Sequence, residues 1–276
     1  MTDRIKAVSS KGKQYLALIR GSIMEGLAFR TGTIVSILGN LIYLVIIYYL
    51  WKAIYDSSPS DTVNGMTFHD TLVYLVLAAA MFNYLNTFVV WEIGRNYQSG
   101  ALVEFLVKPI DYQVFLFFVS FGNSLVAFMI TFLPTFVLVY LVTHGSFRLG
   151  VNLVFFLLSI LLAMVINYCV DFFVGTVCLY TQSIWGVNIM KEVVVSLLSG
   201  ATIPLAFFPE RLRGIVDVLP FRAIYHMPLA ILTESNMSMA DYMGGIGIQL
   251  FWALFMILAS KLFWKRSMQI LTVNGG

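Results

Sequence analysis

Six long apolar segments, separated by short polar connections, constrain this chain of 276 residues more than any other feature of its sequence. The hydrocarbon core of a membrane is about 30 Å thick, and roughly 20 apolar residues in a helix cross it. Lipid offers no hydrogen-bond partner to an open backbone, so such a chain crosses as helices whose backbone groups pair internally. The segments predict transmembrane helices at residues 33–51, 71–91, 115–142, 151–182, 188–207 and 244–264.

The composition supports the same class of protein. Hydrophobic residues make up 59% of the chain and charged residues 11%, whereas soluble domains contain about 25% charged residues. The apolar run from Val151 to Leu205 is long enough to cross twice, with a polar turn at Thr181–Asn188. Pro134 predicts a kink in the third span. We therefore expect an all-α integral membrane protein with one transmembrane domain over residues 1–276 and six transmembrane helices.

The basic residues predict the orientation of the chain. An even number of crossings puts both termini on one side of the membrane. That side would hold twelve Lys and Arg residues, namely Arg4, Lys6, Lys11, Lys13, Arg20, Arg30, Arg95, Lys108, Lys191, Lys261, Lys265 and Arg266. The other side would hold five, namely Lys52, Arg148, Arg211, Arg213 and Arg222. Because basic residues favour the cytoplasmic side, we expect a multi-pass protein with both termini in the cytoplasm.

Residues 1–30 form a separate amphipathic segment. Apolar residues recur there at spacings of three and four, at Leu16, Ile19, Ile23 and Leu27. This spacing predicts an interfacial helix on the inner leaflet, with its basic side chains near anionic head groups. Two interpretations stay open, a helix that also touches a cytoplasmic partner and an ordinary basic flank that happens to be helical.

The loop between spans two and three contains a short helix, expected within residues 99–109. Pro109 keeps the preceding residue out of helical conformation, so the helix must end before it. Such a helix is too short to be stable alone, and its apolar side therefore needs a surface to dock on. The candidate docking residues are Gly100, Leu102, Glu104, Phe105, Leu106, Lys108 and Pro109. A surface loop packed against its own bundle is the alternative.

Residues 209–232, between spans five and six, are interrupted by prolines. Four of the seven prolines of the chain lie between Ser199 and Leu229. Pro209 suits the first turn of a helix of about ten residues, roughly 15 Å long, which covers half of the hydrocarbon thickness. Pro220 ends this helix and a second short one follows, which predicts a re-entrant helical pair over the outer side of the bundle. The candidate gate residues are Gly200, Pro204, Phe208, Pro209, Pro220, Phe221 and Pro228.

Four polar residues within the spans are candidates for a pathway or for bonds between helices. Asn83 and Asn86 lie three residues apart in span two, where they could contact substrate or a neighbouring helix. Asn167 and Asp171 lie four residues apart in span four. An ionisable residue inside a span is a functional hypothesis by default. Asp171 would lie near the inner interface, so a proton relay and a structural pair with a base or another subunit both stay open.

Several chemistries find no support in the sequence. No G-x-x-x-x-G-K-[ST] motif occurs, so the chain has no loop to hold the phosphates of ATP. No nucleophile with a paired base is visible, so we expect no catalytic residue. His69, His144 and His226 show no ligand spacing, and we expect no metal site. The net charge of +3 follows from the membrane topology and implies no nucleic-acid partner.

Two loops carry motifs in a fixed order. In the inner loop, "SGALVEFLVKPI" contains Gly-x-Leu, Leu and Pro-Ile at Gly100, Leu102, Leu106 and Pro109. The outer loop contains Ser-Gly, Pro, Phe-Pro, Leu-Pro-Phe and a final Pro, at Ser199, Gly200, Pro204, Phe208, Pro209, Leu219, Pro220, Phe221 and Pro228. These motifs resemble those of ABC-2-type (type V) ABC exporter permeases. The chain is most similar to a short, uncharacterised branch in which two unlike permeases often share one ATPase.

The resemblance implies a dimer with an identical or homologous permease in a bacterial plasma membrane. Two copies of an ABC ATP-binding subunit would engage the inner loops and would hold ATP and Mg²⁺. This chain would then bind no cofactor itself and would not be an enzyme. The implied function is ATP-driven export of an amphiphile, such as a drug, a lipid or a peptide, by alternating access. The alternatives are a secondary transporter or channel, and a membrane scaffold or immunity protein without a pathway.

Overall fold

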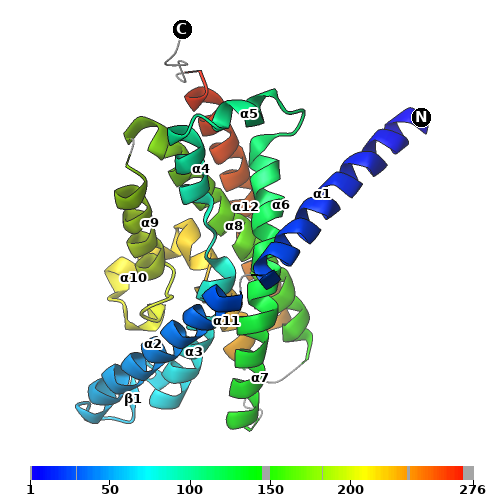
Figure 1. The fold of residues 1–276 in the computed structure, drawn as a ribbon. Helices are drawn as coiled ribbons and strands as arrows, with labels where there is room; N and C mark the ends of the chain where they lie inside the picture. Colours follow the sequence, from blue (N-terminus) through cyan, green and yellow to red (C-terminus); the bar gives the residue numbers. More distant parts are fainter. Residues whose placement is uncertain (1, 29, 145–149, 182, 235–236, 270–276) are drawn as a thin grey trace.

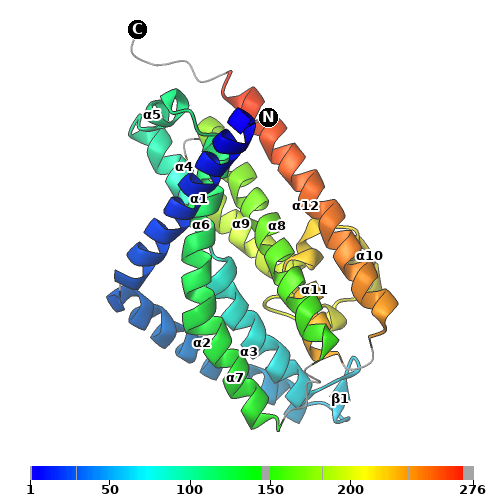
Figure 2. The ribbon, with the colours of Figure 1, turned by 90° about the vertical axis from the view of Figure 1, so that its right-hand side faces the viewer.

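The computed structural model describes residues 2–28, 30–144, 150–181, 183–234 and 237–269, most of them in helices. In chain order the elements are α1 (Thr2–Ala28), α2 (Arg30–Asp56), β1 (Thr62–Val63), β2 (Met66–Thr67), α3 (Phe68–Leu85), α4 (Val89–Gln98), α5 (Leu102–Val107), α6 (Tyr112–Ala127), α7 (Leu133–Val142), α8 (Val151–Thr181), α9 (Ile184–Leu198), α10 (Glu210–Asp217), α11 (His226–Thr233) and α12 (Met239–Ser267). Figures 1 and 2 show α5 and the last turns of α12 at one end of the molecule, and the antiparallel β1–β2 hairpin at the other. We call these the α5 end and the hairpin end.

Five helical stretches in the described ranges are long and apolar enough to cross a membrane. They are Ile37–Asp56, Phe68–Gln98, Tyr112–Val142, Val151–Thr181 and Met239–Ser267. The chain is therefore an all-α, multi-pass membrane protein. The fifth expected span, residues 188–207, corresponds to α9, which has 15 residues and ends at Leu198. A helix of that length rises about 22 Å, so the count of six spans stays a prediction.

The second span is not one helix. We expected a continuous helix over residues 71–91, but α3 ends at Leu85 and α4 begins at Val89. Asn86 between them is extended, with φ −68° and ψ 99°. No proline or glycine lies at this break, so its cause must be tertiary contacts, which are described with the candidate site.

The third span is continuous but distorted, near the proline that predicted a kink. Residues Phe128–Phe132 form a π-helical turn between α6 and α7, and Pro134 follows at the start of α7. The Thr131 hydroxyl donates a hydrogen bond of 2.5 Å to the Ala127 carbonyl in this turn. A π turn and a proline are both known causes of local helix distortion.

α1 packs lengthwise on α6. The rings of Tyr15 and Phe118 stack with centroids 4.5 Å apart. Gly122 permits the close approach, because a Cβ there would lie 2.7 Å from the Ile19 carbonyl oxygen. α1 therefore runs obliquely along the bundle (Figure 2). A helix that lay flat on the inner leaflet would instead run across one end of the bundle.

α8 is the central helix of the bundle. It contacts α4, α9, α11 and α12, and more than half of the residues in its most apolar stretch are buried. The main core lies between α3, α8 and α11, and a second core lies toward the α5 end between α4, α5, α6 and α8. Burial of these apolar side chains is the main stabilising contribution from packing.

The proline-rich segment folds into short helices, as its sequence pattern predicts. The helix α9 ends at Leu198, and Gly200, two residues later, turns the chain away with a φ of +81°. A 3₁₀ turn, α10, a second 3₁₀ turn and α11 follow in order. α11 is buried against α3 and α8, whereas α10 leaves Leu212 and Ile215 exposed. The segment thus places one short helix in the core and one on the surface.

Candidate functional site: the α5 loop and the polar cluster behind it

α5 forms the loop that the sequence singled out for docking. Gly100 has a φ of +75°, which glycine adopts without strain, and it turns the chain out of α4. α5 covers six residues and ends at Val107, because Lys108 before Pro109 is extended, with φ −73° and ψ 142°. The predicted segment is therefore a separate short helix at one end of the bundle (Figure 1).

Two of the candidate docking side chains face the chain's own bundle. Leu102 is 1% exposed. The Phe105 ring packs against Tyr112 and Phe115, with centroids 5.1 and 5.2 Å away, and the Lys108 Nζ lies 4.3 Å from its centroid. These contacts fix α5 on the rest of the bundle. Leu102 and Phe105 therefore lie on the inward side of α5, which we call its base, and do not form its outward surface.

The outward face of α5 carries other apolar side chains. Val103 is 42% exposed and Val107 is 82% exposed, and Glu104 beside them is exposed as well. The side chain of Leu106 lies outside the described residues. The sequence indicates this face, because Val103 and Val107 are four residues apart and therefore lie on one side of a helix. The predicted docking residues include Glu104 on this exposed side as well as Leu102 and Phe105 on the inward side.

The base of α5 joins three further helices. The Asn96 amide of α4 donates hydrogen bonds to Tyr112 Oη at 2.9 Å and to Glu92 Oε1 at 3.2 Å. The Tyr112 ring of α6 stacks on Trp264 of α12 with centroids 5.3 Å apart. α5 is therefore linked to α4 and, through Tyr112, to α6 and α12.

α4 is held between α8 and α9 by glycine contacts. A Cβ added at Gly94 would lie 2.4 Å from Ile184 Cγ1, and one at Gly175 would lie 2.7 Å from Ile93 Cδ1. Only glycine permits such approaches. α4 therefore packs closely against the start of α9 and the adjoining part of α8.

A buried polar cluster lies behind α4, at the break of the second span. Asp171 of α8 is fully buried, and its Oδ1 accepts from Lys191 Nζ of α9 at 3.0 Å. The Thr87 hydroxyl, from the break itself, donates to Asp171 Oδ2. The Asn167 amide donates to the Leu85 carbonyl at 2.8 Å and to Asp171 Oδ2 at 3.4 Å. Asn167 and Asp171 thus act together, as one polar site.

This cluster explains the break of the second span. Where α3 stops, backbone groups lose their helical partners, and a buried unpaired group costs about 1–3 kcal/mol. Asn167 supplies a donor to the freed Leu85 carbonyl. α8 continues ten residues beyond Asp171, which is about 15 Å of helix. The basic partner of Asp171 is Lys191.

Lys191 therefore does not belong to the exposed flank in which the orientation argument counted it. Its side chain is 8% exposed, because it reaches from α9 to the buried carboxylate. The distribution of basic residues still favours the same side, since eleven others remain there in the predicted topology.

Asn83 and Asn86 no longer share one helical face. α3 ends between them, Asn86 caps the helix with an exposed side chain, and Asn83 is partly exposed.

The candidate gate residues form the turns of the proline-rich segment. Pro204, Pro220 and Pro228 are buried, Pro209 caps α10, and Phe208 and Phe221 are partly buried. Trp51 of α2 is buried against the neighbouring Phe207, with ring centroids 4.6 Å apart. The segment is therefore anchored to α2 as well as to α3 and α8.

His226, at the start of α11, ties the two ends of this segment together. Its backbone N–H donates to the Ser199 carbonyl at 3.1 Å. Burial, together with the charges of Arg222 and Arg213, lowers the pKa of His226 to about 3. The imidazole is therefore neutral at physiological pH. Within the described ranges, no group of three or more His, Cys, Asp or Glu side chains is placed so that it could hold a metal ion.

The comparisons with known proteins agree with this architecture. A family model described as "ABC-2 family transporter protein" matches residues 41–275, from the middle of α2 onward. The chain belongs to the ABC-2 transporter family. An ABC-2 permease works with ABC ATP-binding subunits, so the family implies such partners. No curated protein matches the chain.

Proposed function

We propose that this ABC-2 permease is the transmembrane subunit of an ATP-driven exporter that moves an amphiphile, such as a drug, a lipid or a peptide, by alternating access. The observation that carries the proposal is the two-sided character of α5. One side is fixed to the bundle through Leu102 and Phe105, and the other exposes Val103 and Val107. Exposed apolar side chains grouped on one surface are typical of a contact with another protein.

The energy for transport must come from another polypeptide. The sequence has no loop for the phosphates of ATP, so ATP and Mg²⁺ would be held by two ATP-binding subunits on separate chains. Each would contact α5 of one permease in a dimer of like or unlike permeases, with both termini on the cytoplasmic side of a bacterial plasma membrane.

The contacts of α5 support a route for this energy. A push on Val107 would move Phe105 and its partner Tyr112, and through Asn96 it would move α4. α4 begins at the break of the second span, where Asp171 and Lys191 join α8 to α9. A cycle of ATP binding and hydrolysis would then shift the bundle between two states, by binding one state more tightly than the other.

A direct test is purification of the tagged full-length chain from its native membrane. The proposal predicts that a subunit carrying the G-x-x-x-x-G-K-[ST] motif copurifies and that the reconstituted complex hydrolyses ATP. Val107→Asp should reduce this association, whereas Val218→Asp should not, although Val218 beside α10 is also largely exposed, at 72% against 82% for Val107. Absence of an ATP-binding subunit, or equal effects of the two substitutions, would contradict the proposal.

One observation also favours the alternative of a secondary transporter. Interrupted helices and buried charges occur at the binding sites of such proteins, and this chain has both at Thr87 and Asp171. Transport by vesicles that contain the permease alone, driven by an imposed ion gradient without ATP, would support that alternative against the exporter.

A further inference from the structure

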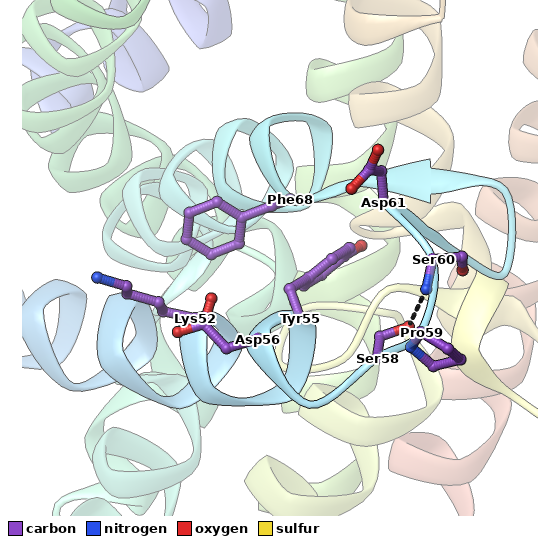
Figure 3. A pocket seen from close by; sticks show the side chains of 8 residues that line it. All are labelled: Lys52, Tyr55, Asp56, Ser58, Pro59, Ser60, Asp61 and Phe68. Atoms are coloured by element: carbon purple, nitrogen blue, oxygen red, sulfur yellow. Dashed lines mark hydrogen bonds between the residues drawn. The ribbon is translucent and has the colours of Figure 1, made fainter.

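A cavity of about 370 Å³ opens at the hairpin end, between the end of α2 and the start of α3 (Figure 3). This volume lies within the range of about 300–1,000 Å³ that small-molecule sites occupy. Its walls are Lys52, Tyr55 and Asp56 of α2, the loop of residues 58–61, and Phe68 of α3. The docking loop lies at the opposite end of the bundle, so the cavity belongs to neither α5 nor the Asp171 cluster.

The aromatic wall of the cavity is fixed in place. Tyr55 Oη donates to the Met66 carbonyl at 2.9 Å and shares a hydrogen bond of 2.8 Å with Thr71 Oγ1. The Phe68 ring lies 5.5 Å from the Tyr55 ring. A capping box between Thr67 and Asp70 holds the start of α3. The cavity is therefore formed before any ligand enters it.

The charges of the cavity are not paired with one another. In the described part of the chain, Lys52, Asp56 and Asp61 take part in none of the four ion pairs. Figure 3 shows Lys52 and Asp56 on one side of the Tyr55 ring and Asp61 on the other. One cation and two carboxylates beside aromatic rings are complementary to a ligand with a phosphate and an ammonium group, because ammonium groups bind carboxylates and ring faces.

The position of the cavity indicates where such a ligand comes from. The first membrane-span candidate ends at Asp56 and the second begins at Phe68, so the cavity lies at a membrane surface. On the face of α2 that carries Lys52, Tyr49 is 65% exposed and Val45 is 55% exposed. This apolar strip continues from the cavity toward the bilayer interior and would contact acyl chains.

We propose that this cavity binds the head group of phosphatidylethanolamine. The ammonium group would lie between Asp56 and Asp61, against the rings of Tyr55 and Phe68, and the phosphate would pair with Lys52. The acyl chains would follow the exposed strip of α2. The inference goes beyond the transport function, and it holds whether or not α5 binds an ATPase.

The test measures which lipids stay bound to the purified full-length chain. The protein is reconstituted in vesicles of equal parts phosphatidylethanolamine and phosphatidylglycerol and extracted in mild detergent, and native mass spectrometry counts the retained lipids. We expect phosphatidylethanolamine to be enriched. The Asp56→Asn/Asp61→Asn variant should lower the enrichment about three- to tenfold, the effect expected for two partly exposed ion pairs. Lys52→Gln should lower retention of phosphatidylethanolamine about threefold.

Two control variants each remove one charge on α10, one negative and one positive. Glu210→Gln and Arg211→Gln change exposed residues outside the cavity and should leave the enrichment unchanged. In a second arm, phosphatidylcholine replaces phosphatidylethanolamine, and weaker retention is expected because its ammonium cannot donate hydrogen bonds. The proposal is overturned if the carboxylate variant keeps the enrichment, if Glu210→Gln abolishes it equally, or if phosphatidylcholine is retained as well.

Discussion

Replacing Lys191 by methionine would leave the fully buried carboxylate of Asp171 without the cation that pairs with it. Methionine nearly preserves the length of the side chain, so the change removes charge more than volume. Removing one partner of a buried ion pair costs about 3–5 kcal/mol, because the other charge remains in a medium that solvates it poorly. Thr87 and Asn167 still donate to the carboxylate, so we expect a loss of about 3 kcal/mol, the lower end of that range.

A second substitution separates the charge from other effects. Asp171→Asn keeps the shape of the carboxylate and removes its charge, so Lys191→Met with Asp171→Asn should lose less stability than Lys191→Met alone. We expect the double variant to recover about 2 kcal/mol, within the range of coupling energies between contacting residues.

The assay is unfolding in mixed micelles by titration with SDS, followed by tryptophan fluorescence. Lys265→Met, an exposed lysine of α12, is the control and should change the free energy of unfolding by less than about 0.5 kcal/mol. If Lys191→Met costs no more than this control, or if the double variant is the least stable of the set, the ion pair does not hold α8 and α9 together as described.

Three further predictions test other parts of the structure with the same unfolding assay. Gly175→Ala should destabilise the protein by about 1–3 kcal/mol, because its Cβ would lie 2.7 Å from Ile93 Cδ1. The control is Gly247→Ala, whose Cβ would have no atom within 4 Å and which should be neutral or stabilising by up to about 1 kcal/mol. Equal effects of the two substitutions on the free energy of unfolding would contradict the contact. Asn167→Leu should cost about 1–3 kcal/mol, because it removes the donor to the carbonyl at the break of the second span; no loss would mean that this hydrogen bond does not stabilise the break. His226 has a pKa lowered from 6.5 to about 3, so the unfolded chain binds a proton that the folded one does not, and stability present above pH 6.5 should fall by about 2 kcal/mol on reaching pH 5. His226→Gln should flatten this dependence, and an unchanged slope would contradict the buried, neutral imidazole.

Much of the fold is predictable from the sequence because the deciding signals are local. Apolar runs bounded by charge predict the spans, and Pro109 predicts the end of α5 at Val107. The series of prolines after Ser199 predicts short helices in place of one long one, and α10 and α11 are such helices.

The break of the second span could not be predicted in this way. The sequence around Asn86 contains no helix breaker, and α3 ends there because Asn167 and Asp171, about 80 residues later in the chain, bind the Leu85 carbonyl and the Thr87 hydroxyl. Contacts at such separations leave no periodic signal in a single sequence.

The same limit explains why the sequence predicted only part of the candidate site. Asp171 was singled out because a charge inside a span is costly, but its partner Lys191 reads as an ordinary basic flank until the fold brings α8 and α9 together. The sequence leaves open which side of α5 faces outward for a related reason. A six-residue helix has apolar residues on both sides, and only the packing of Phe105 against Tyr112 shows which side faces inward.

The central claim, that this permease is moved by a separate ATP-binding subunit through α5, is tested most directly by site-specific photo-crosslinking in the native membrane. A photo-reactive amino acid is placed at Val107 on α5 or at Val218 beside α10, and the crosslinked products are identified by mass spectrometry. We predict a crosslink from position 107 to a subunit that carries the ATP-binding motif, and none from position 218. If position 107 crosslinks only to lipid or to this chain itself, α5 is not the contact with the ATPase, and the account is wrong.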